Sequence, residues 1–107
     1  MYYFCGSRLG QILHARLRMQ CSSLKQHLYF KNIEPDPYCT CGGVETTEHF
    51  LLHCKNYDRL RHKHFEPFNI NITTNLLLYG DKNMNDDYNA KLFTCVQRFI
   101  IETKRFL

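Results

Sequence analysis

The sequence lacks the features that mark membrane and secreted proteins. No apolar run approaches the roughly 20 residues that a membrane-spanning helix needs. The opening Met1-Tyr2-Tyr3-Phe4 is not a charged segment leading into a long apolar one, so no secretory signal is visible. Internal repeats and low-complexity tracts are also missing. We therefore expect a soluble intracellular protein, in the nucleus or the cytoplasm, with no membrane partner.

The chain is also short. Its 107 residues are expected to form a single domain, 1–107, with a helical lead-in at 1–34, a zinc motif at 35–60 and a helical tail at 61–107. A domain of this size buries only about 65% of its unfolded surface, so it benefits from a metal ion that crosslinks it. Six cysteines would suggest disulfides in a secreted protein. Without a visible secretory signal, Cys5, Cys21 and Cys95 are predicted to be reduced, buried thiols.

The other three cysteines belong to the most informative motif of the chain. The spacing C-x-C-x7-H-x4-C places four soft-metal ligands within sixteen residues: Cys39, Cys41, His49 and Cys54. Structural Zn²⁺ takes four thiolate or imidazole ligands in a closed tetrahedron, and three Cys with one His are a standard set. In an extended C-x-C the two cysteines point to the same side and can hold one ion together. The sequence therefore predicts a structural Zn²⁺ site.

The segment after the paired cysteines predicts a tight turn and then a short helix. Gly42 and Gly43 permit the turn. The run 45–48, Glu-Thr-Thr-Glu, is typical of a helix start with a threonine N-cap and an acidic first turn, and this helix carries His49. Because residues five apart lie about 140° apart on an ideal α-helix, we expect the helix to distort or end by Cys54. His53 is predicted to be a surface histidine and not a ligand.

The segment CTCGGVETTEHFLLHCKNY, residues 39–57, resembles the C-terminal cysteine/histidine motif of non-LTR (LINE-type) retrotransposon polyproteins, which follows their reverse transcriptase. The stretches before and after it, RLGQ to PDPYC and LLLYGDKN to KRFL, also resemble that region, so the resemblance covers nearly the whole chain. Lys55 departs from the pattern, because such sequences often have proline there. The matching positions are Cys39, Cys41, Gly42, Glu45, Thr46, Glu48, His49, Leu51, Cys54 and Tyr57. The resemblance implies a C-terminal fragment of a reverse transcriptase protein.

A catalytic centre is not expected in this chain. Polymerase chemistry needs paired carboxylates around two metal ions, and the adjacent acids Asp86 and Asp87 fit better at a helix start, where they stabilise the positive end of the dipole. No spaced set of acids and lysines after Cys54 indicates a nuclease. A closed zinc site leaves no position for a reactive water. We therefore predict no enzymatic activity and no small-molecule substrate.

Basic residues near the motif suggest sequence-nonspecific binding to RNA or DNA, because Lys and Arg release the counterions of the phosphate backbone. The alternative is a structural, protein-docking zinc module that packs against a polymerase body. A basic stripe joining Arg16, Arg59 and Arg61 would favour nucleic acid, whereas exposed apolar helix faces without such a stripe would favour docking. The candidate nucleic-acid contacts are Arg16, Arg18, Lys55, Arg59, Arg61 and Lys63.

The hydrophobic pattern predicts a mainly α fold, a small helical domain with a zinc-stapled C-x-C…H…C knuckle. We expect a first helix capped by Ser7, and a second capped by Ser22 or Ser23. An extended link at Pro35 and Pro37 leads to the motif. Later elements are a basic helix ending near Pro67, a loop over 69–74, a short turn capped by Thr74 and closed by Gly80, and a long last helix with an apolar stripe from Tyr88 to Thr103.

Overall fold

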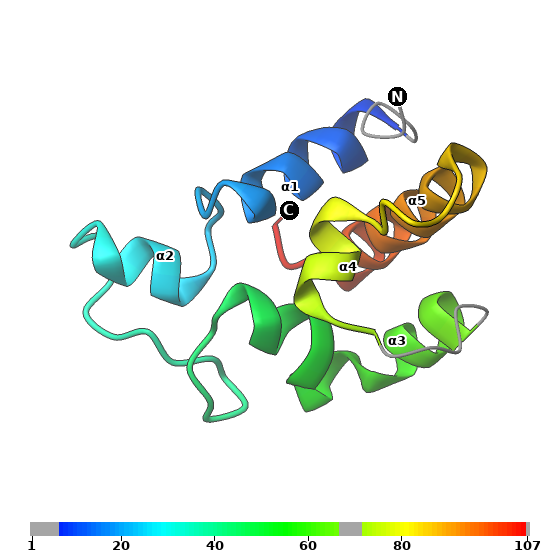
Figure 1. Cartoon of the computed structure of the whole chain (residues 1–107). Coiled ribbons are helices and arrows are strands. Elements are labelled where there is room, and N and C mark those ends of the chain that lie inside the picture. Colours follow the sequence, from blue (N-terminus) through cyan, green and yellow to red (C-terminus); the bar gives the residue numbers. More distant parts are fainter. Residues whose placement is uncertain (1–6, 67–71, 107) are drawn as a thin grey trace.

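The computed structural model describes residues 7–66 and 72–106. These residues form helices joined by turns, with one isolated β-bridge between Tyr38 and Val44, so the predicted mainly α fold is confirmed (Figure 1). The elements are α1 (Arg8–Arg18), α2 (Lys25–Phe30), the π-helix η2 (His49–His53), the 3-10 turn η3 (Lys55–Tyr57), α3 (Asp58–Phe65), α4 (Thr74–Tyr79) and α5 (Asp86–Thr103). Within these ranges, no helix is both long and apolar enough to cross a membrane.

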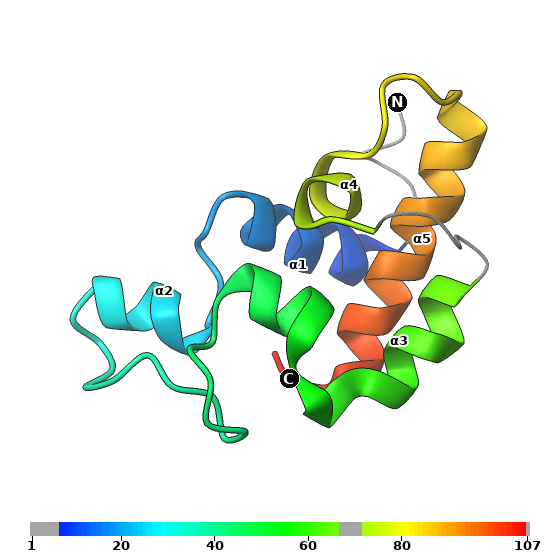
Figure 2. The ribbon, with the colours of Figure 1, turned by 60° about the horizontal axis from the view of Figure 1, so that its bottom comes forward.

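Helix α5 is the element on which the core is built. Its predicted apolar stripe is buried, with Leu92, Phe93, Val96 and Phe99 fully enclosed. Helices α1 and α3 both pack on α5, and both views place them on different sides of it (Figures 1 and 2). Burial of each large apolar side chain contributes about 1.5 to 3 kcal/mol. Because α1 and α3 pack on different sides of α5, their solvent-exposed faces point in different directions.

An aromatic cluster connects the metal motif to this core. Phe50 follows the predicted ligand His49, and its ring centroid lies 5.6 Å from that of Phe99 and 5.3 Å from that of Phe106. Tyr57 meets the Phe50 ring edge to face, and Phe65 of α3 contacts Phe99 at 5.0 Å. Such tilted and edge-on pairs add about 0.5 to 1.5 kcal/mol each beyond burial. The motif is therefore part of the core and not an appended loop.

Several predicted helix ends are confirmed. The Ser7 hydroxyl accepts from the Gly10 N–H at 3.0 Å and caps α1, and Gly80, at φ 76°, closes α4. The N-cap of α4 is Thr73 and not Thr74, which is already helical. The expected Ser22 or Ser23 cap of α2 is wrong, because α2 starts at Lys25 and its N-cap residue, Leu24, offers no side-chain acceptor.

Other expectations have mixed outcomes. The predicted basic helix is α3, which ends at Phe65, close to the expected end. Pro67 and residues 69–71 of the expected loop lie outside the described residues. Cys21 is exposed, so the prediction of a buried thiol is wrong there, while Cys95 is half-buried and both are free thiols. Cys5 lies outside the described part of the chain.

A buried histidine fixes α1 against α4 and α5. His14 is fully buried, its Nε2 lies 2.7 Å from the Leu77 carbonyl oxygen, and its ring meets Phe93 edge to face at 4.6 Å. Burial, with the nearby Arg18 charge, lowers the pKa of His14 from 6.5 to about 4, although the hydrogen bond to Leu77 opposes this shift. The folded protein therefore holds His14 neutral in mildly acidic solution.

This histidine makes stability fall with acidification. Between pH 6.5 and about 4 the unfolded chain binds a proton at His14 and the folded chain does not, so the contribution is complete above pH 6.5 and declines below it. From pH 7 to pH 5 we expect the wild type to lose about 2 kcal/mol more stability in urea than His14→Gln. Both proteins keep the same metal motif, so acid effects there cancel in the difference. Equal losses in the two proteins would contradict the assignment.

Candidate metal centre

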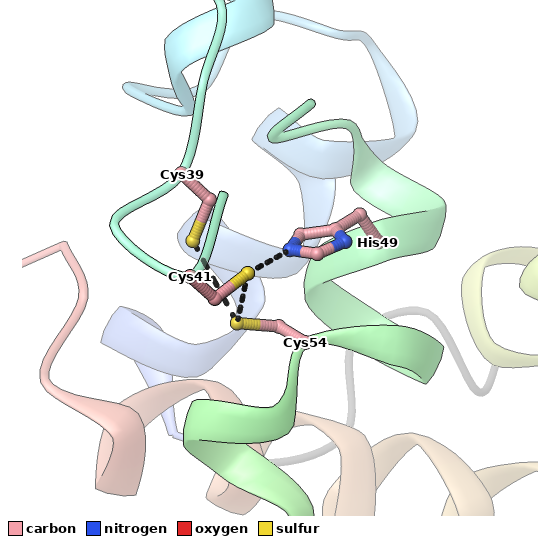
Figure 3. A group of neighbouring side chains, drawn as sticks. All are labelled: Cys39, Cys41, His49 and Cys54. Carbon is pink, nitrogen blue, oxygen red and sulfur yellow. Dashed lines mark hydrogen bonds between the residues drawn. The ribbon is translucent and has the colours of Figure 1, made fainter. Parts of the chain in front are cut away.

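The four predicted ligands converge at one point (Figure 3). One ligand atom from each of Cys39, Cys41, His49 and Cys54 lies within 4.8 Å of all the others. The Cys54 sulfur is 3.7 Å from each of the other two sulfurs, and the Cys41 sulfur is 3.1 Å from His49 Nε2. Cys39 and Cys54 are buried, whereas Cys41 and His49 are partly exposed. The predicted ligand set is therefore assembled in the fold.

These separations fit a single tetrahedral metal ion. With metal–sulfur bonds of about 2.3 Å, the edges of a regular tetrahedron are about 3.8 Å, close to the two sulfur separations of 3.7 Å. An imidazole ligand bound at about 2.0 to 2.1 Å would lie about 3.6 Å from each sulfur, so His49 needs to withdraw from Cys41 by roughly half an ångström. The four ligand atoms are therefore close enough together to share one metal ion.

Two glycines shape the turn that presents Cys39 and Cys41. The Gly42 N–H donates to the Cys39 carbonyl at 2.9 Å, and the Cys39 N–H donates to the Gly43 carbonyl at 2.7 Å. Gly42 has φ 103°, a conformation that residues with a Cβ rarely adopt. A Cβ on Gly43 would lie 3.0 Å from the His49 ring, so this glycine permits close approach of the ligand. The prediction of a tight turn at these glycines is confirmed.

The other two ligands lie at the two ends of the π turn, with His49 the first residue of η2 and Cys54 its C-cap. The Thr46 hydroxyl accepts from the His49 N–H at 2.9 Å, which confirms the predicted threonine cap. The Cys54 N–H then donates to the His49 carbonyl at 2.7 Å, a bond that spans five residues. In an α-helix these side chains would diverge by about 140°, but the wider π turn brings them to one side. The expected distortion before Cys54 is confirmed, and it is the feature that completes the ligand set.

Protonation of the cysteines depends on the metal. Burial raises the pKa of the Cys54 thiol to about 12, whereas a backbone hydrogen bond from Gly43 lowers the pKa of Cys41. A buried thiolate therefore needs a cation nearby, and a coordinated metal ion supplies that charge and removes the proton outright. Metal uptake at this cluster consequently releases protons and weakens at low pH.

Glu45 joins the metal motif to the start of α2 and to Arg105, which follows α5. It is 97% buried; it accepts from the Lys25 N–H at 2.7 Å and from Arg105 Nε at 2.9 Å. Glu45 thus provides the acceptor at the start of α2 that Ser22 and Ser23 do not. Burial alone would raise the pKa of Glu45, but hydrogen bonds from Arg105 and Lys25 hold it below its usual range. The sequence placed Glu45 only at the start of the motif helix and gave no signal for these distant partners.

Arg61, a predicted nucleic-acid contact, supports the metal motif from α3. Its guanidinium donates to the carbonyls of Phe50 and Leu51 at 2.8 Å each and also to that of Cys54, and it pairs with Asp58 at 2.8 Å. These carbonyls belong to the π turn and its end, where helical partners are missing. Only 11% of the Arg61 side chain is exposed. The structure therefore places its guanidinium against the metal motif, and its contact with nucleic acid stays a prediction.

The remaining basic candidates do not form one stripe. Arg18 donates to the Leu78 carbonyl and lies over Phe93, and Lys63 pairs with Glu102 at 2.6 Å. Lys55 and Arg59 are exposed beside the metal motif, and neither forms an ion pair with any described residue. Arg16 is exposed on α1, which lies on a different side of α5 from α3 (Figures 1 and 2). A stripe joining Arg16, Arg59 and Arg61 is absent from the described residues.

His53 and the acidic pair Asp86 and Asp87 lie away from the ligand cluster, as expected. The His53 side chain is 62% exposed and lies 3.7 Å from Glu48, outside the ligand cluster, as predicted. Asp86 and Asp87 lie in the first turn of α5, where Asp87 pairs with Lys91 at 3.3 Å. The acidic pair therefore occupies the helix start that the sequence indicated.

Each ligand of the cluster should be required for metal retention. We expect one metal ion per chain by elemental analysis of reduced protein, and most of it lost in Cys41→Ser and in His49→Gln, because three ligands hold the ion far more weakly than four. His53→Gln is the matched histidine control and should retain the ion. A metal-free wild type, or a His53→Gln protein as depleted as His49→Gln, would contradict the site.

Glu45 should contribute to stability without contributing to metal stoichiometry. Glu45→Gln removes the charge opposite Arg105, which leaves a half-buried cation unpaired, and should lower the free energy of unfolding by about 2 kcal/mol. Glu48→Gln, an exposed change in the same segment, should cost under about 0.5 kcal/mol. The double change Glu45→Gln with Arg105→Met should cost less than the sum of its parts. Additive losses would show that the pair does not couple.

Comparison with known proteins adds no further assignment. No protein-family model, no curated protein and no solved structure gives a significant match to this chain. The identification of a metal-binding cluster therefore rests on its four ligands and their geometry. The resemblance to the LINE-type motif stays a prediction.

Proposed function

We propose that this chain is a zinc-stapled structural module that docks onto a larger protein body. The observation that carries the proposal is the closed Cys39, Cys41, His49, Cys54 cluster, whose four ligands leave no position for substrate. A ligand set rich in thiolate favours Zn²⁺ over hard cations such as Mg²⁺ or Ca²⁺. The ion joins the turn at 39–41 to the π-helix η2 and so fixes the segment between α2 and α3.

Exposed apolar residues support docking. On α1, Leu9, Ile12 and Met19 follow helical spacing and remain exposed, Met19 by 68%. Around the end of α2, Tyr29, Phe30 and Ile33 are exposed as well, Phe30 by 67%. Large apolar side chains exposed in groups on a small domain are typical of a protein interaction site. Two features therefore favour docking over nucleic-acid binding: the exposed apolar residues, and the absence of a basic stripe from the described residues.

The resemblance supports a particular setting for the module. The matched positions include all four ligands and also Glu45, whose contacts tie the motif to α2 and to Arg105. In the proteins that the motif resembles, this region follows a reverse transcriptase. We propose that the chain belongs to such a protein and packs against its polymerase body, itself without catalytic residues.

Binding of RNA or DNA is the second candidate. Lys55 of η3 and Arg59 of α3 are exposed and follow the ligand Cys54 in the chain, and the Lys63 side chain, although paired with Glu102, is 60% exposed. About three such contacts would give a log–log salt slope of roughly −2 for single strands. Replacement of these three residues by Ala should abolish that slope while metal content is unchanged.

Photo-crosslinking separates the two candidates. A photoreactive amino acid in place of Met19, in the cells that make the protein, should give a nuclease-resistant crosslink to one identifiable protein, because docking buries this position. The same substitution at Lys91, whose side chain is 71% exposed on α5, is the matched control and should not. If Met19 captures only RNA or DNA, or if both positions capture the same proteins equally, the docking function is wrong.

A further inference from the structure

The net positive charge of this chain comes from its first third. Residues 1–33 contain five Arg and Lys and no Asp or Glu, a net +5, whereas residues 34–107 contain nine basic and ten acidic residues, a net −1. The whole net charge of +4 therefore comes from the segment that holds α1 and α2. Two of the five residues are already engaged, Arg18 with the Leu78 carbonyl and Lys25 with Glu34.

A pocket lies within this basic segment. It has a volume of about 240 Å³ and is formed between the second half of α1, the connection from α1 to α2, α2 with the residues that follow it, and the segment after α5. Its apolar lining includes Leu13, Leu28, Ile33 and Phe106, and its charged lining consists of Arg16 and Lys31. Both cations are exposed, and neither forms an ion pair with a described residue. No acidic residue lines the pocket.

The pocket lies next to the exposed apolar residues of α1, which are Leu9, Ile12 and Met19. Arg16, at the pocket, is seven residues from Leu9 and four from Ile12, and Ile12 is seven from Met19, so these residues share one flank of the helix. Leu13 and Ile33 extend the apolar surface into the pocket. The combined surface, which we call the groove, is the exposed apolar flank of α1 with the pocket at one end and Arg16 and Lys31 at its edge.

We propose that this groove binds an acidic amphipathic helix of a partner protein. One large apolar side chain of that helix fills the pocket, its apolar stripe covers Leu9, Ile12 and Met19, and its carboxylates meet Arg16 and Lys31. This inference rests on the proposed docking function and adds the chemistry of the partner. Helices in grooves use such anchors at i, i+3 or i+4, and i+7, and charge complementarity sets the choice of partner.

The apolar flank decides between a protein and a nucleic acid as the occupant. Phosphates would satisfy Arg16 and Lys31, but a strand would leave the aliphatic side chains of Leu9, Ile12 and Met19 in water or against charged backbone. A protein helix covers both kinds of group at once. Lys55 and Arg59, beside the metal cluster, line no part of this pocket and serve as an internal comparison.

The test uses a fluorescent helical peptide with Leu and Phe at the anchor spacing and Glu on the flanks, and a control peptide with Lys in place of Glu. The metal-loaded full chain should bind the acidic peptide saturably and the basic peptide at least about tenfold more weakly. Arg16→Glu with Lys31→Glu should weaken acidic-peptide binding at least about tenfold. The matched reversal Lys55→Glu with Arg59→Glu should change it less than about twofold. Ile12→Gln with Met19→Gln, which alters no charge, should also weaken it severalfold.

Metal content and circular dichroism confirm that each variant is folded. Absence of saturable binding by the folded wild type, or equal losses in the two charge reversals, would overturn the proposal. Oligouridine that binds in place of the peptide and is lost with Arg16→Glu and Lys31→Glu would identify a nucleic-acid surface and also overturn it. A protein captured at Met19 by crosslinking, without binding of the acidic peptide, would leave docking in place and reject only the acidic partner.

Discussion

The π turn between His49 and Cys54 is the constraint on which the rest of this structure depends. An ordinary helix would carry these two ligands apart, and the cluster with Cys39 and Cys41 would then be incomplete. Three side chains stabilise this turn. Thr46 caps its start, Arg61 satisfies the carbonyls that its wider winding leaves without partners, and Phe50 anchors it in the aromatic core. Metal binding and core packing therefore stabilise the same local distortion.

Glu45 extends this coupling to α2 and to the segment after α5. Its position directly after the Gly42-Gly43 turn is set by the ligands, and its carboxylate in turn fixes the first N–H of α2 and the guanidinium of Arg105. A second link lies nearby, because buried His27 of α2 bonds Ser22 on one side and Thr47 on the other. Through these contacts the metal centre positions α2, and α2 forms one wall of the pocket that we assign to a partner. The metal thus shapes a binding surface without being part of it.

The features that could be predicted from sequence are those written in short, local patterns. The glycine turn, the threonine cap and the Ser7 cap each depend on residues within a few positions of one another, and the four ligands and the apolar stripe of α5 each lie within one segment of about sixteen residues. The role of Arg61 could not be predicted, because its acceptors exist only once the π turn has formed ten residues earlier. The same holds for Glu45, whose partners are 20 and 60 residues away. Charge alone placed Arg61 among the candidate phosphate contacts, and its burial against the metal motif had no signal in the sequence.

The central claim is that a metal ion in the Cys39, Cys41, His49, Cys54 cluster holds the motif and α2 in place against the helical core built on α5. Amide hydrogen exchange of the metal-loaded and the chelated chain tests it most directly. The account predicts that removal of the metal abolishes protection in residues 25–30 and 38–57 while most protection in α5 survives. Unchanged protection of the motif after verified metal removal would contradict it.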